Sequence, residues 1–440
     1  MGDTQLPPSA EDDPNASPTR TPAPPDEVAE PDIPAAVDEL FATPQRTRRS
    51  RTVLLPALAV LTALALGGLL IIFTNQEALQ AWAGFFRDPV RALSTSWTAV
   101  WAAYYALFSG ALGSPSEIVR AIGSGDLAQF RSSLAPISET VVTATPLILV
   151  GLSVAIGFRA GLFNIGGEGQ MNTGALVASA AGFSFPGLPG PVHLVLVLVA
   201  GFTGGALWGA IPGFLKAKTG AHEVITTIML NFVAVSLVLY VLSTHFYGQQ
   251  AEPVAKPVKV SYPHLFGSSL RIHFGIFVAL AVAAAVAWLL NRTTVGFRFR
   301  AVGANPDAAR AAGMSPSRTT ILVMTLAGGI AGLAGSNQLL SVTPSLLPGF
   351  ASGIGFDGIA IALLGRARPA GVVAAAFLFG ALRAGGRTMQ VVTQVPSDII
   401  TVIQALVIVF VAAPALVRAI YRVKARGVTG RDTFAKGWGA

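Results

Sequence analysis

The sequence predicts an all-α polytopic membrane protein with about ten transmembrane helices, several of them broken, preceded by a disordered tail. Of the 440 residues, 52% are hydrophobic and 12% are charged. That charged fraction is about half of the roughly 25% found in soluble domains. Several apolar runs are long enough to cross a bilayer. The chain has no cysteine, which excludes disulfides, haem-thiolate ligation and cysteine-zinc sites.

Residues 1–50 differ in composition from the rest and are rich in proline, acidic residues, serine and threonine. Such a segment buries too little apolar surface to offset its ordering entropy, so we expect a disordered tail. Arginines at positions 46, 48, 49 and 51 precede an apolar run at 53–73, which at about 21 residues is long enough to span. A signal peptide has a shorter leader and core, so we expect this run to remain as an anchor.

The other apolar runs have two lengths. The long ones lie at residues 137–158, 192–215, 224–243, 273–290, 319–340 and 397–417. Three shorter ones lie beside glycine or proline breaks, at 171–183, 353–365 and 370–383. Short, interrupted runs are typical of the broken helices of transporters. Counting all of these runs places both chain termini on the same side of the membrane.

The basic residues support that count. Most of the 30 Lys and Arg residues fall in segments that it assigns to the cytoplasm, above all 1–51, 292–318 and 415–440. Cytoplasmic loops carry such an excess, so we expect both termini, including a C-terminal tail at 426–440, in the cytoplasm. The net charge of +8 therefore reflects orientation, and no basic stripe with interleaved aromatics indicates nucleic acid.

Residues 74–136 are external in this arrangement and rich in aromatic residues of the kind favoured at membrane surfaces. These are Trp82, Phe85, Phe86, Trp97, Trp101, Tyr104 and Tyr105. We expect an interfacial helix here. The alternative is an extra span over residues 97–112, which would invert the orientation of everything that follows.

Glycines recur at every fourth position in two predicted helices. One series is Gly201, Gly205, Gly209 and Gly213, and the other is Gly328 and Gly332. Such small residues let helices approach closely, so both series predict a tightly packed bundle rather than contact with a ligand.

The segment 303–314 predicts a short helix in a basic cytoplasmic loop. Asn305 suits the N-cap, Pro306 the first helical position, Asp307 the positive end of the helix dipole, and Gly313 a left-handed residue that ends the helix. The chain contains no G-x-x-x-x-G-K-[ST] phosphate loop. If the bundle uses ATP, the ATPase must be a separate chain, and this helix is a candidate for its docking element.

Two polar breaks interrupt the apolar chain, one at residues 159–173 and a second at Phe356 and Asp357. Backbone that leaves the helix at membrane depth is tolerated where protein or a water-filled cavity satisfies it. Glu168 is an ionisable residue in the first break and Asp357 in the second. The blocks 137–243 and 319–417 share a rhythm of long span, break, short span and further spans, which predicts an inverted repeat with a path at its interface.

Four stretches resemble the permease subunits of bacterial ABC importers, in the branch of simple-sugar and branched-chain amino-acid permeases. They are FNIGGEGQ at 163–170, HEVITTIMLN at 222–231, VGANPDAARAAG at 302–313 and GFDGIAIALLG at 355–365. Within this branch the chain is most similar to the longer permease of nucleoside importers. The likeness covers about residues 53–420 and implies a transmembrane permease domain over 51–425. It does not include the acidic tail.

The resemblance implies a bacterial plasma-membrane protein that is itself no enzyme and needs no cofactor or metal. It implies a second related permease, two ATPase subunits that bind ATP, and an extracytoplasmic substrate-binding protein. The coupling helix that contacts the ATPase then lies at 303–314. Its expected contact residues are Gly303, Asn305, Asp307, Ala308, Arg310 and Gly313.

A nucleoside is neutral and dense in hydrogen-bonding groups, so its path needs amides, hydroxyls and an aromatic or apolar wall. The residues with these properties are Asn164, Gln170, Asn172, Asn231, Phe356 and Asp357. Asn172 and Asn231 can equally form hydrogen bonds between helices. For Glu168 three roles stay open: substrate contact, protonation coupling, and acceptance of free amide hydrogens where a helix breaks.

Three alternatives follow from the same residues. A simple-sugar importer, for a ribose-like substrate, is the first, because amides and hydroxyls serve sugars and nucleosides alike. An ion-coupled secondary transporter is supported by the inverted repeat and Glu168. A membrane enzyme has least to support it, because the five histidines lack metal-ligand spacing and no nucleophile-base pair lies in the apolar spans.

Overall fold

The computed structural model describes residues 49–249, 252–267, 270–396 and 398–413, together with Val417, Ile420 and Tyr421. Two units divide the chain, Met1–Thr52 and Val53–Ala440. All but the last few residues of the first unit lie outside the described residues, as does the predicted C-terminal tail at 426–440. The second unit holds everything that follows.

Helices make up nearly all of the second unit's secondary structure. The first half contains α2 (Arg49–Thr74, which begins in the first unit), α3 (Gln76–Ala83), α4 (Pro89–Leu112), α5 (Pro115–Ser124), α6 (Leu127–Ser133), α7 (Ala135–Arg159), α8 (Gly167–Ser184), α9 (Gly190–Thr219) and α10 (Glu223–Leu242). The second half contains β1 (Gly248–Gln249), β2 (Glu252–Ala255), α11 (Gly275–Arg292), α12 (Thr294–Ala304), α13 (Pro306–Ala311), α14 (Pro316–Ser341), α15 (Ile354–Leu364), α16 (Pro369–Thr393) and α17 (Asp398–Ala412).

Seven described helices are long and apolar enough to cross a membrane, namely α2, α7, α9, α10, α11, α14 and α16. Two shorter apolar helices, α15 and α17, complete the predicted set together with α8, whose first turns are polar. The predicted short run at 370–383 was too short, because α16 continues to Thr393. Arg383 and Arg387 interrupt its apolar pattern, but both pair with carboxylates in the folded chain.

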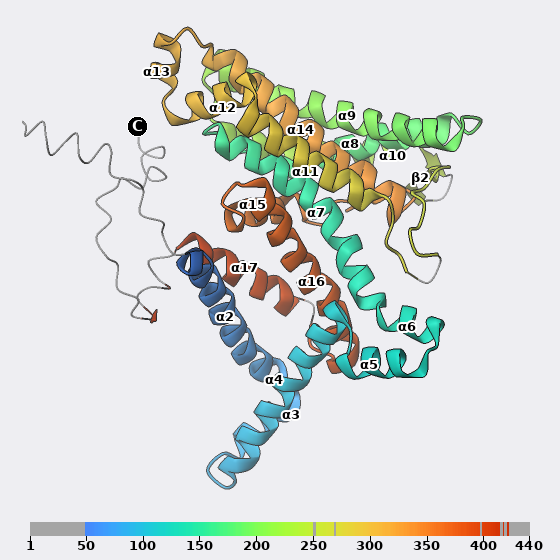
Figure 1. Ribbon diagram of the computed structural model, residues 1–440, viewed down its shortest axis with the longest axis vertical. Helices are drawn as coiled ribbons and strands as arrows, with labels where there is room; N and C mark the ends of the chain where they lie inside the picture. The colour runs from blue at the N-terminus through green and yellow to red at the C-terminus, as the bar shows by residue number, and fades with distance from the viewer. Residues whose placement is uncertain are drawn as a thin grey trace, which may run out of the picture. The chain divides into compact units, whose positions relative to one another are not determined.

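The blocks 137–243 and 319–417 form two sets of four helices, α7–α10 and α14–α17. Helices of one set pack against helices of the other. α14 packs along α8 and α9, whereas α7 packs along α15 and α16. α7 and α14 also contact each other, as do α8 and α15. Figure 1 shows this packing, with α14 beside α8 and α9 and α7 beside α16. The arrangement matches the predicted repeat of 137–243 in 319–417.

The glycine series forms the contact between α9 and α14. A Cβ atom on Gly205 would overlap the backbone of Gly328 and Gly332, and one on Gly209 would overlap Met324 and Gly328. Because residue numbers rise along α9 as they fall along α14, these two helices run antiparallel. The predicted role of the glycines in close packing is confirmed.

Within the expected interfacial segment 74–136, the longest helix is α4. It is not among the helices that meet the length and composition of a span. Its small residues Gly110 and Ala111 pack against α16, and the Tyr104 hydroxyl donates to the Leu64 carbonyl of α2. Trp97 and Trp101 point outward, with 69% and 63% of their surface exposed. This division suits a helix at a membrane surface, with aromatic residues on its free face.

A strap of extended chain after β2 covers the ends of α8 and α14. Ala255, Val258 and Tyr262 donate backbone hydrogen bonds to Leu346, Pro344 and Leu340, at 2.8 to 2.9 Å. The Tyr262 ring stacks on His273 with centroids 5.4 Å apart. Burial, reinforced by His264 and Arg271, lowers the pKa of His273 to about 4, so this imidazole is neutral at pH 7. The strap thus keeps its shape by hydrogen bonds and ring stacking.

Candidate functional site

The first break is a loop between separate helices. α7 ends at Arg159, Gly161 takes a positive φ of 70°, and α8 begins at Gly167. The Asn164 and Gln170 side chains bond to each other across this loop, Nδ2 to Oε1 at 3.0 Å and Nε2 to Oδ1 at 3.1 Å. Asn164 Oδ1 also accepts from the Gly166 amide at 3.0 Å. Both residues are buried, so the loop is held by its own polar side chains.

α10 supplies two further supports for this loop. Asn231 Oδ1 accepts from the Gly169 amide at 2.8 Å, and its Nδ2 donates to the Ile165 carbonyl at 3.0 Å. The Thr227 hydroxyl accepts from the Ile165 amide at 3.3 Å. These contacts match the interhelical alternative for Asn231. Its use by a substrate stays a prediction.

The Glu168 carboxylate lies at the start of α15. Its Oε1 accepts from the Gly353 amide at 2.9 Å and its Oε2 from the Gly355 amide at 2.8 Å. α15 has no other side-chain cap, because its N-cap residue is Gly353 with φ 78°. A carboxylate there satisfies free amide donors and complements the helix dipole. Glu168 therefore joins the two predicted breaks, since it belongs to α8 and binds the start of α15.

Asp357 lies one turn into α15 and forms an ion pair with Arg383 of α16, with 2.7 Å between Oδ2 and Nη2. The two side chains are only 17% and 24% exposed. Our sequence analysis did not identify Arg383 as part of the site. An arginine within an apolar helix was the available signal, because such a charge normally has a partner.

Two other predicted path residues lie near these groups. Asn172 is buried one helical turn after Glu168, and Phe356 precedes Asp357 with 48% of its surface exposed. The structure thus gathers Asn164, Glu168, Gln170 and Asn231 around the start of α8, with α15 beside them.

The short helix predicted at 303–314 forms as α13, over Pro306–Ala311, while Gly303 belongs to α12. Its caps are the predicted ones, and its role in coupling stays a prediction. Asn305 Oδ1 accepts from the amides of Asp307 and Ala308 at 3.0 Å each, and Gly313 has a φ of 81°. Asp307 and Arg310 form an exposed ion pair of 2.9 Å. Their side chains are 85% and 67% exposed and are therefore free to contact another protein.

Gly303 connects the α12–α13 segment to the first break. A Cβ atom at Gly303 would meet the backbone of Arg159, Ala160 and Gly161 within 2.8 Å. Such close backbone contact is possible because both Gly303 and Gly161 lack side chains. Gly303 thus holds the last turn of α12, which leads into α13, against the loop that carries Asn164.

The family comparison covers this whole arrangement. Residues 137–412 match a family model described as the branched-chain amino acid transport system permease component. The chain belongs to this permease family. It is a multi-pass membrane protein, and the matched residues extend from α7 through α17.

Curated relatives of this permease include transport proteins for nucleosides and a sugar. The guanosine ABC transporter permease protein NupP of Bacillus subtilis is 40% identical over 297 residues, 66% of this chain and 85% of the relative. The nucleoside ABC transporter permease protein NupB of Lactococcus lactis is 33% identical over 366 residues, 80% and 94% of the two chains. A glucose ABC transporter permease protein of Haloferax volcanii is 33% identical over 371 residues, 81% and 86% of the two chains. No solved structure matches the permease significantly.

Proposed function

We propose that this permease is the membrane subunit of an ABC importer for nucleosides. The observation that carries the proposal is the 40% identity to a guanosine permease over 297 residues, 66% of the chain. A neutral substrate suits the region, because its carboxylates are already engaged: Glu168 by backbone amides and Asp357 by Arg383. The remaining polar groups are amides and hydroxyls.

The proposed path runs along the interface of the two helix sets. Asn164, Gln170, Asn172 and Asn231 offer amide groups, and Phe356 offers a ring for stacking on a base. Asn164 and Gln170 bond to each other in the described conformation. A passing nucleoside would exchange those bonds for bonds to its own base or ribose, at little net cost.

The proposal includes separate partner chains. ATPase subunits would bind α13 on the cytoplasmic side of a bacterial plasma membrane, and a substrate-binding protein would deliver the nucleoside outside. A second permease is supported by the relatives, since the guanosine permease protein NupQ and the nucleoside permease protein NupC, which come from the same organisms as NupP and NupB, also match this chain. Both chain termini would then lie in the cytoplasm.

Competition for uptake tests the substrate. A strain that lacks the gene should lose uptake of labelled nucleoside at low concentration, and the cloned gene should restore it. Excess unlabelled nucleoside should abolish the restored uptake, while ribose and glucose leave it unchanged. If excess sugar suppresses the restored uptake and excess nucleoside does not, the substrate is a sugar and the nucleoside assignment is rejected.

The energy source needs its own test. Deletion of the partner ATPase should remove uptake, and an uncoupler should leave it intact while cellular ATP is maintained. The opposite pattern would support the ion-coupled alternative, which otherwise has only the inverted repeat and Glu168 in its favour.

A further inference from the structure

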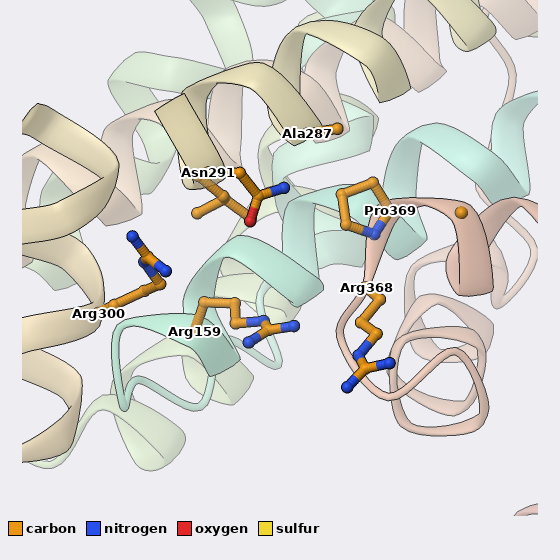
Figure 2. A pocket seen from close by; sticks show the side chains of 8 residues that line it. Arg159, Ala287, Asn291, Arg300, Arg368 and Pro369 are labelled. Carbon is orange, nitrogen blue, oxygen red and sulfur yellow. The ribbon is translucent and has the colours of Figure 1, made fainter. Parts of the chain in front are cut away.

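A cavity of about 390 Å³ lies between α11, α12 and α16 and plays no part in the proposed transport path. Three arginines line it: Arg159 at the end of α7, Arg300 in α12 and Arg368 just before α16. Figure 2 shows these three side chains, with Arg159 between Arg300 and Arg368. The other lining residues are Ala287, Leu290, Asn291, Pro369 and Ala370, so no carboxylate lines the cavity in the described structure.

The fold holds this group of positive charges in place. Arg159 Nε donates to the Ala367 carbonyl at 2.9 Å, which ties α7 to the turn between α15 and α16. In that turn Arg366 and Ala367 have positive φ angles of 54° and 48°. Non-glycine residues rarely adopt this conformation, so tertiary contacts must maintain it. The turn brings Arg368 to the cavity that Arg159 and Arg300 share.

Like charges so placed repel one another, and an anion would relieve that repulsion. The start of α16 adds to the positive potential. Arg368 is its N-cap residue and makes no side-chain capping bond, so the positive end of a 25-residue helix opens on the cavity. Three guanidinium groups and a helix start together make a site for a phosphate-bearing group.

The residues that line the cavity favour a phospholipid headgroup over a free phosphate ion. α11 and α16 are both candidate membrane spans, and their ends meet here. The cavity also has apolar lining residues, namely Ala287, Leu290, Pro369 and Ala370. A free phosphate ion makes no use of an apolar wall, whereas a phospholipid places its phosphate among the charges and its glycerol and chains along the helices.

We propose that this cavity binds the phosphodiester headgroup of an anionic phospholipid. The bound lipid would neutralise the arginines and join the end of α11 to the turn before α16. Transport of a particular substrate is not needed for this role, so the proposal stands independently of the nucleoside assignment.

Lipid retention tests the proposal. The full chain is placed in nanodiscs of equimolar phosphatidylglycerol and phosphatidylcholine, released in a mass spectrometer under native conditions, and its retained lipids are counted. We expect retained phosphatidylglycerol to exceed phosphatidylcholine. The double variant Arg300→Gln/Arg368→Gln should lower that ratio by at least roughly fivefold, since each arginine near a membrane surface contributes on the order of a fivefold preference for an anionic lipid.

The matched control is Arg292→Gln/Arg298→Gln, which removes the same charge from exposed neighbours on α11 and α12 that do not line the cavity. This control should keep the wild-type ratio, and an equal loss in both double variants would reject the site. A second arm adds inorganic phosphate to nanodiscs of phosphatidylcholine alone, at constant ionic strength. Raised thermal stability there, with no retained phosphatidylglycerol in the mixed nanodiscs, would assign the cavity to a free anion and overturn the lipid proposal.

Discussion

Glu168 illustrates what a single side chain does in this permease. A carboxylate in an apolar bundle is costly unless its oxygens accept hydrogen bonds, and here both accept from amides at the start of α15. Sequence reasoning named Asn164 and Gln170 as substrate groups and left three roles open for Glu168, one of them the acceptance of free amide hydrogens where a helix breaks. The contacts of Glu168 suit that last role, in which the acid braces the start of α15, while the substrate contacts of all three residues remain predictions.

Replacing Glu168 tests its proposed bracing role. Glu168→Gln replaces one acceptor oxygen of the side chain with an NH2 group, which is a donor. One of the two backbone amides at the start of α15 therefore loses its acceptor. We expect a loss of about 1–3 kcal/mol in stability, measured as a lower melting temperature of the purified protein. The matched control Glu139→Gln removes a carboxylate that is 30% exposed and paired with Arg271, and should cost less, about 0–1 kcal/mol. Normal stability with lost uptake would instead make Glu168 a substrate ligand.

The Asp357–Arg383 pair allows a separate test. Either Asp357→Asn or Arg383→Gln leaves one charge without its partner in a mostly buried place, at a cost on the order of 3 kcal/mol. The double variant should recover much of the stability because no charge remains unpaired. Melting temperatures of all three variants give the coupling between the residues. If the double variant is stable but inactive in uptake, Asp357 or Arg383 also acts in transport. If its loss of stability equals the sum of the losses in the two single variants, the ion pair does not contribute to stability.

Among the elements, the packed helices α9 and α14 show most clearly what a sequence pattern predicts. The four-residue spacing of glycines indicated close packing before any partner was known. It did not identify which helix was the partner, because a small-residue face fits any similar face. The broken elements were harder to predict, since the start of α15 depends on a carboxylate 185 residues away in the chain.

The α9–α14 contact predicts a sharp difference between two glycines of the same helix. Gly205→Ala places a methyl group against the backbone of Gly328 and Gly332, so we expect a loss of about 1–3 kcal/mol. Gly190→Ala, at the first residue of α9, meets no atom within 4 Å and should leave stability unchanged. Thermal unfolding in one detergent compares the two variants. Equal melting temperatures would mean that α9 and α14 approach less closely than described.

At the scale of the whole molecule, orientation depends on whether α4 crosses the membrane. Its composition places it outside the candidate spans, yet its small residues pack against α16. If α4 crosses, every later element changes sides, including α13, and the proposed ATPase contact is lost.

Cysteine labelling decides this point, and the chain has no native cysteine to remove. Arg87→Cys and Glu117→Cys place exposed thiols before and after α4, while Asp307→Cys marks α13. An impermeant maleimide should label the first two in intact cells and the third only in inverted vesicles. Labelling of the first two from opposite sides would show that α4 crosses the membrane.

The sequence by itself determined the class of the protein, most of its apolar helices, the caps of α13 and the polar residues of the two breaks. These features follow from local properties: apolar length, charge distribution, capping chemistry and the spacing of small residues. The positions of Asn305 and Gly313 predicted both ends of α13 for this reason. Our family assignment likewise rested on short motifs that can be found without a fold.

The tertiary structure decided the partners of the buried polar groups. Glu168 meets Gly353 and Gly355, Asp357 meets Arg383, and Gly303 meets Gly161 only because distant helices converge. It also brought Arg159, Arg300 and Arg368 to one cavity, although the sequence showed them only as scattered positive charges. Hydrogen bonds and ion pairs are short-ranged, so their partners depend on packing in three dimensions, which no local pattern encodes.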